Sequence, residues 1–213
     1  MKLILSIVNI LWFTAFFAQE KLSKVEEITS KEVVINSKGL DDLVIKNSKD
    51  NFLRVSLDNK NSGDYYISTN KISGQIEISF KSNDFVREEI FRKFITNRVS
   101  GVNAVVEVPV GKSITVYGED LGVKSKSYKG DLSVYIKRGN IYLNKIEGTC
   151  NMSFFQGNLY TSNANFNMNI NSNKGKVLLN GEERTSPFAR NEIGIQMFLK
   201  VITIHGNIFI NSN

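Results

Sequence analysis

Glycine recurs every nine residues in the second half of the chain, a pattern that few folds accommodate. Apolar residues stand two and four positions after each glycine, as in residues 130–134. Side chains two positions apart on a strand point to the same side, so each unit predicts a short strand with one buried face. The nine-residue positions are held by Gly130, Gly139, Gly148, Gly157, Phe166 and Gly175.

The residue between the two apolar positions alternates in kind from one unit to the next. The true repeat is therefore about eighteen residues long and holds two unlike strands. One set of units has a small polar residue at this place, and the other has a larger side chain. The small ones are Ser133, Asn151 and Asn169; the larger ones are Tyr142, Tyr160 and Leu178, with Phe209 in the matching place of segment 207–211.

One such coil cannot bury its apolar side chains alone, and stacking coil on coil buries them. Stacking also pairs the backbones at the ~4.8 Å spacing of neighbouring strands. We therefore predict an all-β fold, a single-stranded β-solenoid (β-helix) with two strands per coil; a β-sandwich with similarly spaced strands is the alternative. The coils are expected at 112–129, 130–147, 148–165 and 166–183, with Leu132 on Cys150 on Met168 and Ile141 on Leu159 on Val177.

Less regular segments flank the regular coils, which cover residues 104–181. Short apolar runs between polar turns predict irregular coils over 24–82. Val86, Ile90 and Phe94 lie at helical spacing, so we expect a short helix or a loop inserted at 84–98. Residues 182–213 are expected to close the far end of the stack. Residues 20–213 are predicted to form a single β-repeat domain.

The amino end has the pattern of an export signal. Lys2 precedes 16 uncharged residues, Leu3 to Ala18. A membrane-spanning helix needs about 20 apolar residues, so this run is typical of a signal peptide, predicted over 1–19. A retained signal anchor is the alternative, because Phe16 and Phe17 match a cleavage site poorly. After signal removal we expect no stable membrane span, and an exported chain that is periplasmic, on the cell surface or secreted.

Composition excludes several kinds of chemistry. One Cys and one His are too few for a disulfide framework, a multi-thiolate zinc site or a His-rich centre. The repeat lacks the recurrent acidic ligands of calcium-binding β-rolls. The net charge is +6, but the lysines are scattered, which argues against nucleic acid as a partner. We predict no catalytic, cofactor-binding or metal-binding residues. Cys150 is expected to be a buried, inert thiol, with pairing between chains as the alternative.

Carboxylates occur as adjacent pairs, whose members point to opposite faces of a strand. A carbohydrate-active enzyme on a β-helix would need charged residues from neighbouring coils to converge in one groove. The candidates for such a groove are Glu119, Asp120, Lys137 and Arg138.

The larger side chains of the alternate units predict a row on the outer surface, which is the candidate binding face. Aromatic rows can stack against sugar rings or a partner protein. They can also serve only to stabilise the sheet through cross-strand pairs. The residues of this face are Tyr142, Tyr160, Leu178 and Phe209.

Residues 106–118, followed by 129–134 and 138–143, resemble the DUF4097 family of bacterial β-strand-repeat proteins, which are also described as "putative adhesins". The Asn- and Lys-rich sequence, with Phe-Phe-Ala-Gln-Glu at the end of the leader, resembles members from the Bacteroidetes. The resemblance is firmest over residues 104–181. It implies a β-repeat fold without a catalytic signature. Phe166 and the insert at 84–98 depart from the simple repeat.

The preferred hypothesis is therefore an exported, non-enzymatic β-repeat protein that acts as an adhesin or a cell-envelope scaffold. Its expected partner is a surface glycan or an envelope protein, and no cofactor is expected. The alternative is the carbohydrate-active β-helix enzyme. A third hypothesis is a subunit of an envelope assembly that pairs through an exposed strand edge.

Overall fold

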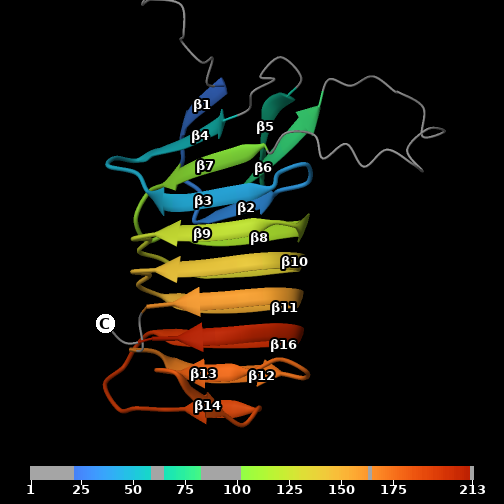
Figure 1. The fold of residues 1–213 in the computed structure, drawn as a ribbon. Helices are drawn as coiled ribbons and strands as arrows, with labels where there is room; N and C mark the ends of the chain where they lie inside the picture. Colours follow the sequence, from blue (N-terminus) through green and yellow to red (C-terminus); the bar gives the residue numbers. More distant parts are fainter. Residues whose placement is uncertain (1–21, 59–64, 83–101, 163–164, 212–213) are drawn as a thin grey trace, which may run out of the picture.

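The computed structural model describes residues 22–58, 65–82, 102–162 and 165–211, and within them the chain is all-β, without a helix. The predicted signal peptide at 1–19 and the insert at 84–98 lie outside the described residues. The described ranges contain sixteen strands, which form one mixed sheet (Figure 1). They are β1 (Leu22–Glu27), β2 (Glu32–Asn36), β3 (Asp42–Asn47), β4 (Phe52–Asp58), β5 (Tyr65–Ile72), β6 (Gln75–Ser82), β7 (Asn103–Val108), β8 (Ser113–Asp120), β9 (Gly122–Lys126), β10 (Leu132–Asn144), β11 (Thr149–Thr161), β12 (Asn167–Ser172), β13 (Val177–Leu179), β14 (Glu182–Arg184), β15 (Phe188–Arg190) and β16 (Phe198–Ile210).

The centre of the molecule is a stack of parallel rungs, each a first arm and a second arm separated by a corner. β8 and β9 are the two arms of one rung, and the continuous strands β10 and β11 are the next two rungs. Leu132 lies between Ile114 and Cys150, each eighteen residues away along the chain. The eighteen-residue repeat is therefore confirmed for these three rungs.

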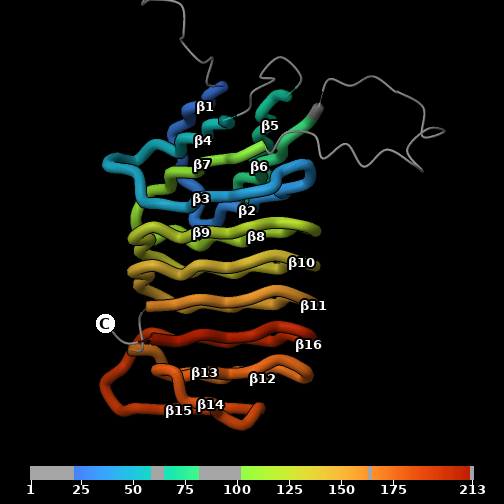
Figure 2. Tube along the Cα trace, in the orientation of Figure 1, coloured from blue at the N-terminus to red at the C-terminus, as the bar shows by residue number. Residues whose placement is uncertain are grey.

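The predicted direct stacking of Cys150 on Met168, and of Leu159 on Val177, is wrong. β16 lies between them, so that Leu199 separates Cys150 from Met168. The dark red strand β16 is seen between β11 and the β12–β13 rung in Figure 1, and the tube in Figure 2 follows the chain as it returns. Residues 182–213 were expected to close the far end of the stack. For residues 198–210 this prediction is wrong, because they fill an inner rung.

The amino-terminal end is built in the same interleaved way. β2 and β3 are the two arms of a rung that pairs with β8 and β9 on one side. On its other side lie β6 and β7, which come later in the chain. After this rung the chain forms β4 and β5 one place farther out, and β6 and β7 later fill the place between. At the other end β12 and β13 likewise lie one place beyond β11, and β16 later fills that place.

Antiparallel strands cover both ends of the stack. β4 pairs with β7 and β1, and β5 pairs with β6. At the other end β14 pairs with β13, and β15 pairs with β12. β14 and β15 are only three residues each. Short edge strands of this kind limit pairing with other chains.

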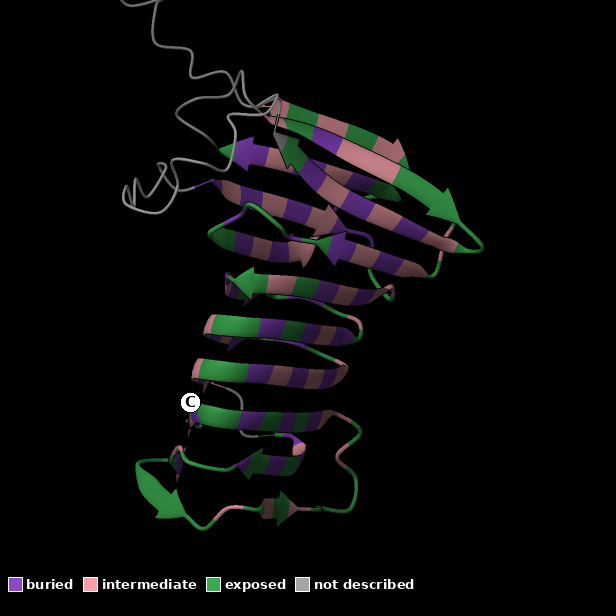
Figure 3. Cartoon of the chain, turned by 90° about the vertical axis from the view of Figure 1, so that its right-hand side faces the viewer, coloured by how far each residue is buried: buried purple, intermediate pink, exposed green. Residues whose placement is uncertain are grey.

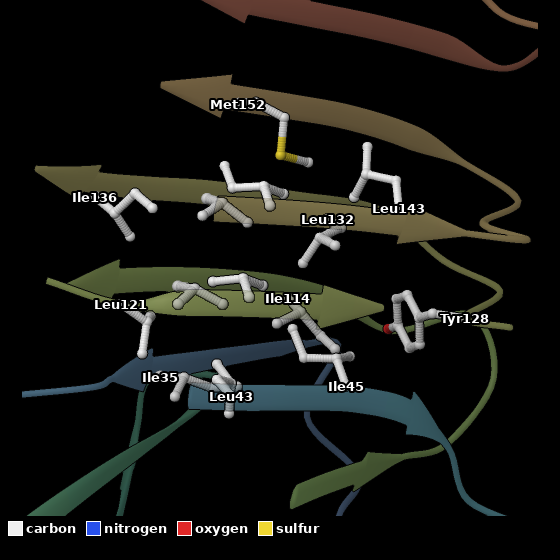
Figure 4. Packing of buried hydrophobic residues seen from close by; sticks show 14 of the residues in the cluster. Ile35, Leu43, Ile45, Ile114, Leu121, Tyr128, Leu132, Ile136, Leu143 and Met152 are labelled. Atoms are coloured by element: carbon white, nitrogen blue, oxygen red, sulfur yellow. The ribbon is translucent and has the colours of Figure 1, made fainter. Parts of the chain in front are cut away.

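The inward side chains of both arms meet in one hydrophobic core (Figure 4). Buried and outer residues alternate along the strands, as the banding in Figure 3 shows. Each fully buried aliphatic side chain contributes about 1.5–3 kcal/mol before entropy is subtracted. The buried ring of Tyr128 donates its hydroxyl proton to the Lys112 carbonyl oxygen, 2.6 Å away.

Two corner glycines show why the repeat needs this residue. Gly139 and Gly157 have φ angles of +145° and +139°, a region that L side chains rarely adopt. A Cβ atom on Gly157 would also lie 1.8 Å from the Gly139 carbonyl oxygen of the neighbouring rung. The positive φ and the close backbone contact therefore both require glycine at these corners.

The thiol of Cys150 is buried, as predicted, and burial raises its pKa to about 12, with a smaller contribution from Asp131. The unfolded thiol ionises near pH 9, so the folded state holds this proton more tightly. We expect the free energy of unfolding to fall as the pH rises from about 9 to about 12. Urea unfolding at pH 8 and pH 10 measures this, and Cys150→Ala should flatten the dependence. An equally steep fall in Cys150→Ala would contradict the assignment.

Candidate functional site

The four residues of the predicted binding face do form one row on the outer side of the second arms, in the order Tyr142, Tyr160, Phe209, Leu178. β10, β11, β16 and β13 position them through successive register pairs. The Tyr142 and Tyr160 rings stack with centroids 4.9 Å apart and planes 9° apart. Tyr160 and Phe209 stack at 4.9 Å and 7°. We call these four residues the aromatic row.

Stacking limits what the aromatic row offers to a ligand. Both faces of the Tyr160 ring are covered by its neighbours, and the Lys124 ammonium lies 5.5 Å from the Tyr142 centroid. Leu178 is the register partner of Phe209 at the other end. The row therefore presents ring edges and two phenol groups outward, rather than ring faces on which a sugar could stack.

Because of this stacking, Tyr160 should contribute to stability. Tyr160→Ala removes two ring stacks, each worth about 0.5–1.5 kcal/mol beyond area burial, so we expect about 1–3 kcal/mol lower stability. Tyr160→Phe keeps the stacks and should change stability little. Urea unfolding of both variants measures the difference. Equal stabilities for the two variants would show that stacking contributes nothing.

An asparagine row runs beside the aromatic row, just after the corner. Asn158 donates its backbone and side-chain N–H groups to Asn140 Oδ1, at 3.2 and 3.1 Å. Asn207 donates to Asn158 Oδ1 at 3.0 Å, and Lys176 donates its backbone N–H to Asn207 Oδ1 at 3.0 Å. These side-chain amides supply hydrogen-bond partners to one another along the stack, and they keep the corners of neighbouring rungs in register.

The charged candidates for a catalytic groove are only partly brought together. Arg138 donates to Asp120 across neighbouring rungs, with Nη2 2.7 Å from Oδ2. This hydrogen bond lowers the pKa of Asp120, so its carboxyl group stays ionised and is poorly suited to donate a proton. Glu119 and Asp120 line a pocket of about 330 Å³ that also includes Asp41, whose Oδ2 accepts the Val102 N–H at 3.0 Å.

A second exposed surface, on the outer side of the first arms, is not among the predicted sites. Tyr117 of β8 and Tyr135 of β10 stack with centroids 5.4 Å apart and planes 17° apart. We call them the tyrosine pair. The two tyrosines are eighteen residues apart in the sequence, but the next residue at this spacing is Ser153, so the repeat of aromatic residues ends there. Exposed apolar side chains that continue this surface are Phe155, Ile202 and Ile204.

Among the described residues no group of three His, Cys, Asp or Glu side chains is arranged to hold a metal ion. No helix in the described part of the chain is long and apolar enough to cross a membrane.

The fold resembles solved structures of bacterial proteins. A "putative cell adhesion protein" from Clostridium sporogenes is 11% identical, and the match covers 91% of this chain and 100% of that one, with a TM-score of 0.56. A "putative adhesin" from Bacteroides fragilis is 12% identical over 91% and 98% of the two chains, with a TM-score of 0.38. A "putative lipid binding protein" from Parabacteroides distasonis is 13% identical over 92% and 96%, with a TM-score of 0.32. No family model and no curated protein matches the chain. At these identities the first structure indicates a shared fold.

Proposed function

We propose that the chain is an exported, non-enzymatic β-solenoid that serves as an adhesion-type binding module or scaffold of the cell envelope. The signal-like leader supports export, and the parallel eighteen-residue register supports a solenoid rather than a sandwich. The C. sporogenes protein of similar fold is named for cell adhesion, which supports the same coarse role. The resemblance to the DUF4097 family agrees with it.

The proposed mechanism is display of a preformed surface. The aromatic row carries this proposal, because its stacked rings hold the phenol groups of Tyr142 and Tyr160 in line at the spacing of the strands. A surface that is already ordered loses little conformational entropy on binding. A surface glycan or an envelope protein would lie across the row and accept hydrogen bonds from the two hydroxyls.

Binding of the purified chain to a glycan panel and to intact cells tests this function. The double variant Tyr142→Phe/Tyr160→Phe removes the hydroxyls and keeps the stacks. Two lost hydrogen bonds of about 1 kcal/mol each should weaken binding about tenfold or more, with the thermal midpoint unchanged. Tyr66→Phe is the matched control on an exposed tyrosine of another strand. Unchanged binding by the double variant would remove the aromatic row from the proposal.

Localisation needs a separate experiment. An impermeant amine reagent applied to intact cells should label lysines of this chain if the protein lies on the surface. Labelling only after the outer envelope is opened would place it in the periplasm. A chain found only in the cytoplasmic fraction would contradict export.

A carbohydrate-active enzyme is the second candidate, because Asp41, Glu119 and Asp120 line one pocket. The hydrogen bond from Arg138 argues against Asp120 as a general acid, and Asp41 Oδ2 accepts the Val102 N–H, so Glu119 is the first candidate for that role. A turnover assay on the same glycan panel decides the question. Turnover that is abolished by Glu119→Gln would replace the binding module with an enzyme.

A further inference from the structure

A pocket of about 390 Å³ lies on the outer side of the first arms, where β2 meets the β5–β6 hairpin (Figure 1). Its volume is within the usual range for sites that hold a small ligand. Ile76 and Ile78 of β6 are buried, so the residues that alternate with them point outward. Phe80 also borders the pocket, but it is only 6% exposed. The other side chains of the lining are polar or charged.

One end of the pocket is rich in hydrogen-bond donors. β2 and β6 are parallel, with Asn36 opposite Ser79, and a lysine of the lining follows two positions after each of them. Lys38 and Lys81 therefore reach the same end. The Asn36 Oδ1 accepts the Lys38 backbone N–H at 3.3 Å, which leaves the amide N–H groups of Asn36 to donate. This end thus offers two ammonium groups, an amide and the Ser79 hydroxyl.

The two ammonium groups are not neutralised by a nearby carboxylate. Within the described part of the chain, neither Lys38 nor Lys81 forms a salt bridge. Glu77, the carboxylate of this pocket, stands four residues before Lys81 on β6, which is about 13 Å along a strand. The Lys81 ammonium lies 6.0 Å from the Tyr66 centroid, and this ring attracts it without cancelling its charge. The pocket therefore has one positive charge in excess, concentrated at one end.

The other end of the pocket suits hydroxyl groups. Asn70 and Glu77 are register partners on β5 and β6, and Ser68 and Ser79 pair between them and the lysines. A carboxylate accepts hydrogen bonds from hydroxyls, while amides and serines both donate and accept. A neutral sugar would leave the two ammonium groups without an anion, and a simple anion would leave Asn70 and Glu77 without a partner. The lining therefore favours a ligand that joins one anionic group to several hydroxyls.

We propose that this pocket binds one anionic sugar residue, with its carboxylate or phosphate at Lys38 and Lys81 and its hydroxyls at Asn70 and Glu77. Lysine ammonium groups are point charges that take either anion. This site lies on the first arms and the amino-terminal hairpin, whereas the aromatic row lies on the second arms. The proposal therefore does not depend on the function proposed for the row.

Saturation-transfer NMR and calorimetry on the full chain test the site with methyl glucuronide, which carries a carboxylate, and glucose 6-phosphate. At least one of them is expected to bind more tightly than methyl glucoside, acetate or inorganic phosphate, and the one that binds identifies the anion. The double variant Lys38→Gln/Lys81→Gln should weaken its binding about tenfold or more, because charge-assisted hydrogen bonds are lost. Added salt should weaken it too, because salt screens exposed charges.

Lys124→Gln is the matched control for Lys81→Gln, because each removes one exposed ammonium group that lies over a tyrosine ring. Lys81→Gln should weaken binding, and Lys124→Gln should bind as the parent does. Lys38 also borders the pocket that contains Glu119, and Glu119→Gln should not weaken binding either.

The proposal is overturned if neither anionic sugar binds at tens of millimolar. It is also overturned if methyl glucoside binds as tightly as the anionic sugars, or if acetate and inorganic phosphate do. Equal losses of affinity in Lys81→Gln and Lys124→Gln, or weaker binding by Glu119→Gln, would likewise place the ligand elsewhere.

Discussion

Replacing Gly157 with alanine is expected to lower the free energy of unfolding by roughly 2–6 kcal/mol. The φ angle of +139° accounts for about 1–3 kcal/mol of backbone strain in a residue with a side chain. The new Cβ would lie 1.8 Å from the Gly139 carbonyl oxygen and 2.8 Å from its carbonyl carbon. Because those atoms belong to the backbone of the next rung, relief requires the two rungs to separate. Forcing atoms into a packed region costs about another 1–3 kcal/mol.

Gly74→Ala is the control that separates the two contributions. Gly74 has a φ of +85°, but a Cβ there would meet nothing within 4 Å. It should therefore show the backbone strain without the steric contact. Urea unfolding of both variants gives the comparison. If Gly157→Ala proves no more destabilising than Gly74→Ala, the close approach of the rungs at the corner is refuted.

Deleting residues 198–213 is expected to abolish cooperative folding of the stack beyond β10. β16 pairs with β11 along one side and with both β12 and β13 along the other. Its removal leaves two strand edges unpaired and uncovers the core residues that Leu199, Val201 and Ile208 now bury. We expect the sigmoidal thermal transition to be lost and a hydrophobic dye to bind. A strand that merely closed the far end would be removed with little effect on the rest.

Two neighbouring point variants on β16 check the same strand without a deletion. Val201 is fully buried, whereas Ile202 is 47% exposed. Val201→Ala should cost about 1–3 kcal/mol, because it removes buried methyl groups and leaves a cavity. Ile202→Ala should cost much less. Equal costs for the two would contradict the inward direction of Val201.

The repeat made much of the local structure predictable, because the phase of the apolar residues decides which side chains face the core. It could not predict the order of the rungs. Residues 167–179 and 198–210 carry the same alternation, so either suits the place next to β11. Both segments have a corner glycine, Gly206 and Gly175, but residues 198–210 form one continuous strand, whereas the other rung is divided into β12 and β13. The more regular segment takes the inner place, where both of its edges are paired.

The candidate site was predictable to a similar extent. The residues of the aromatic row follow from the repeat, but their spatial order depends on where β16 inserts. Only the stacking distances show that the ring faces of the aromatic row are covered. A pocket of about 390 Å³ beside Asn36 was missed because β2, β5 and β6 build it through register pairs between distant residues. Neither spacing nor composition encodes such pairs.

Cross-linking across the outer surface of β16 tests the interleaved order of the rungs most directly. Ser153 and Ile202 are register partners, and so are Ile202 and Asn171. Strand spacing therefore puts Ser153 and Asn171 about 9.6 Å apart, beyond the Cα separation that a disulfide spans. Under mild oxidation Ser153→Cys/Ile202→Cys should cross-link readily, and Ser153→Cys/Asn171→Cys should not. Preferential cross-linking of the second pair would mean that residues 166–183 stack directly on 148–165, and the interleaved fold would be wrong.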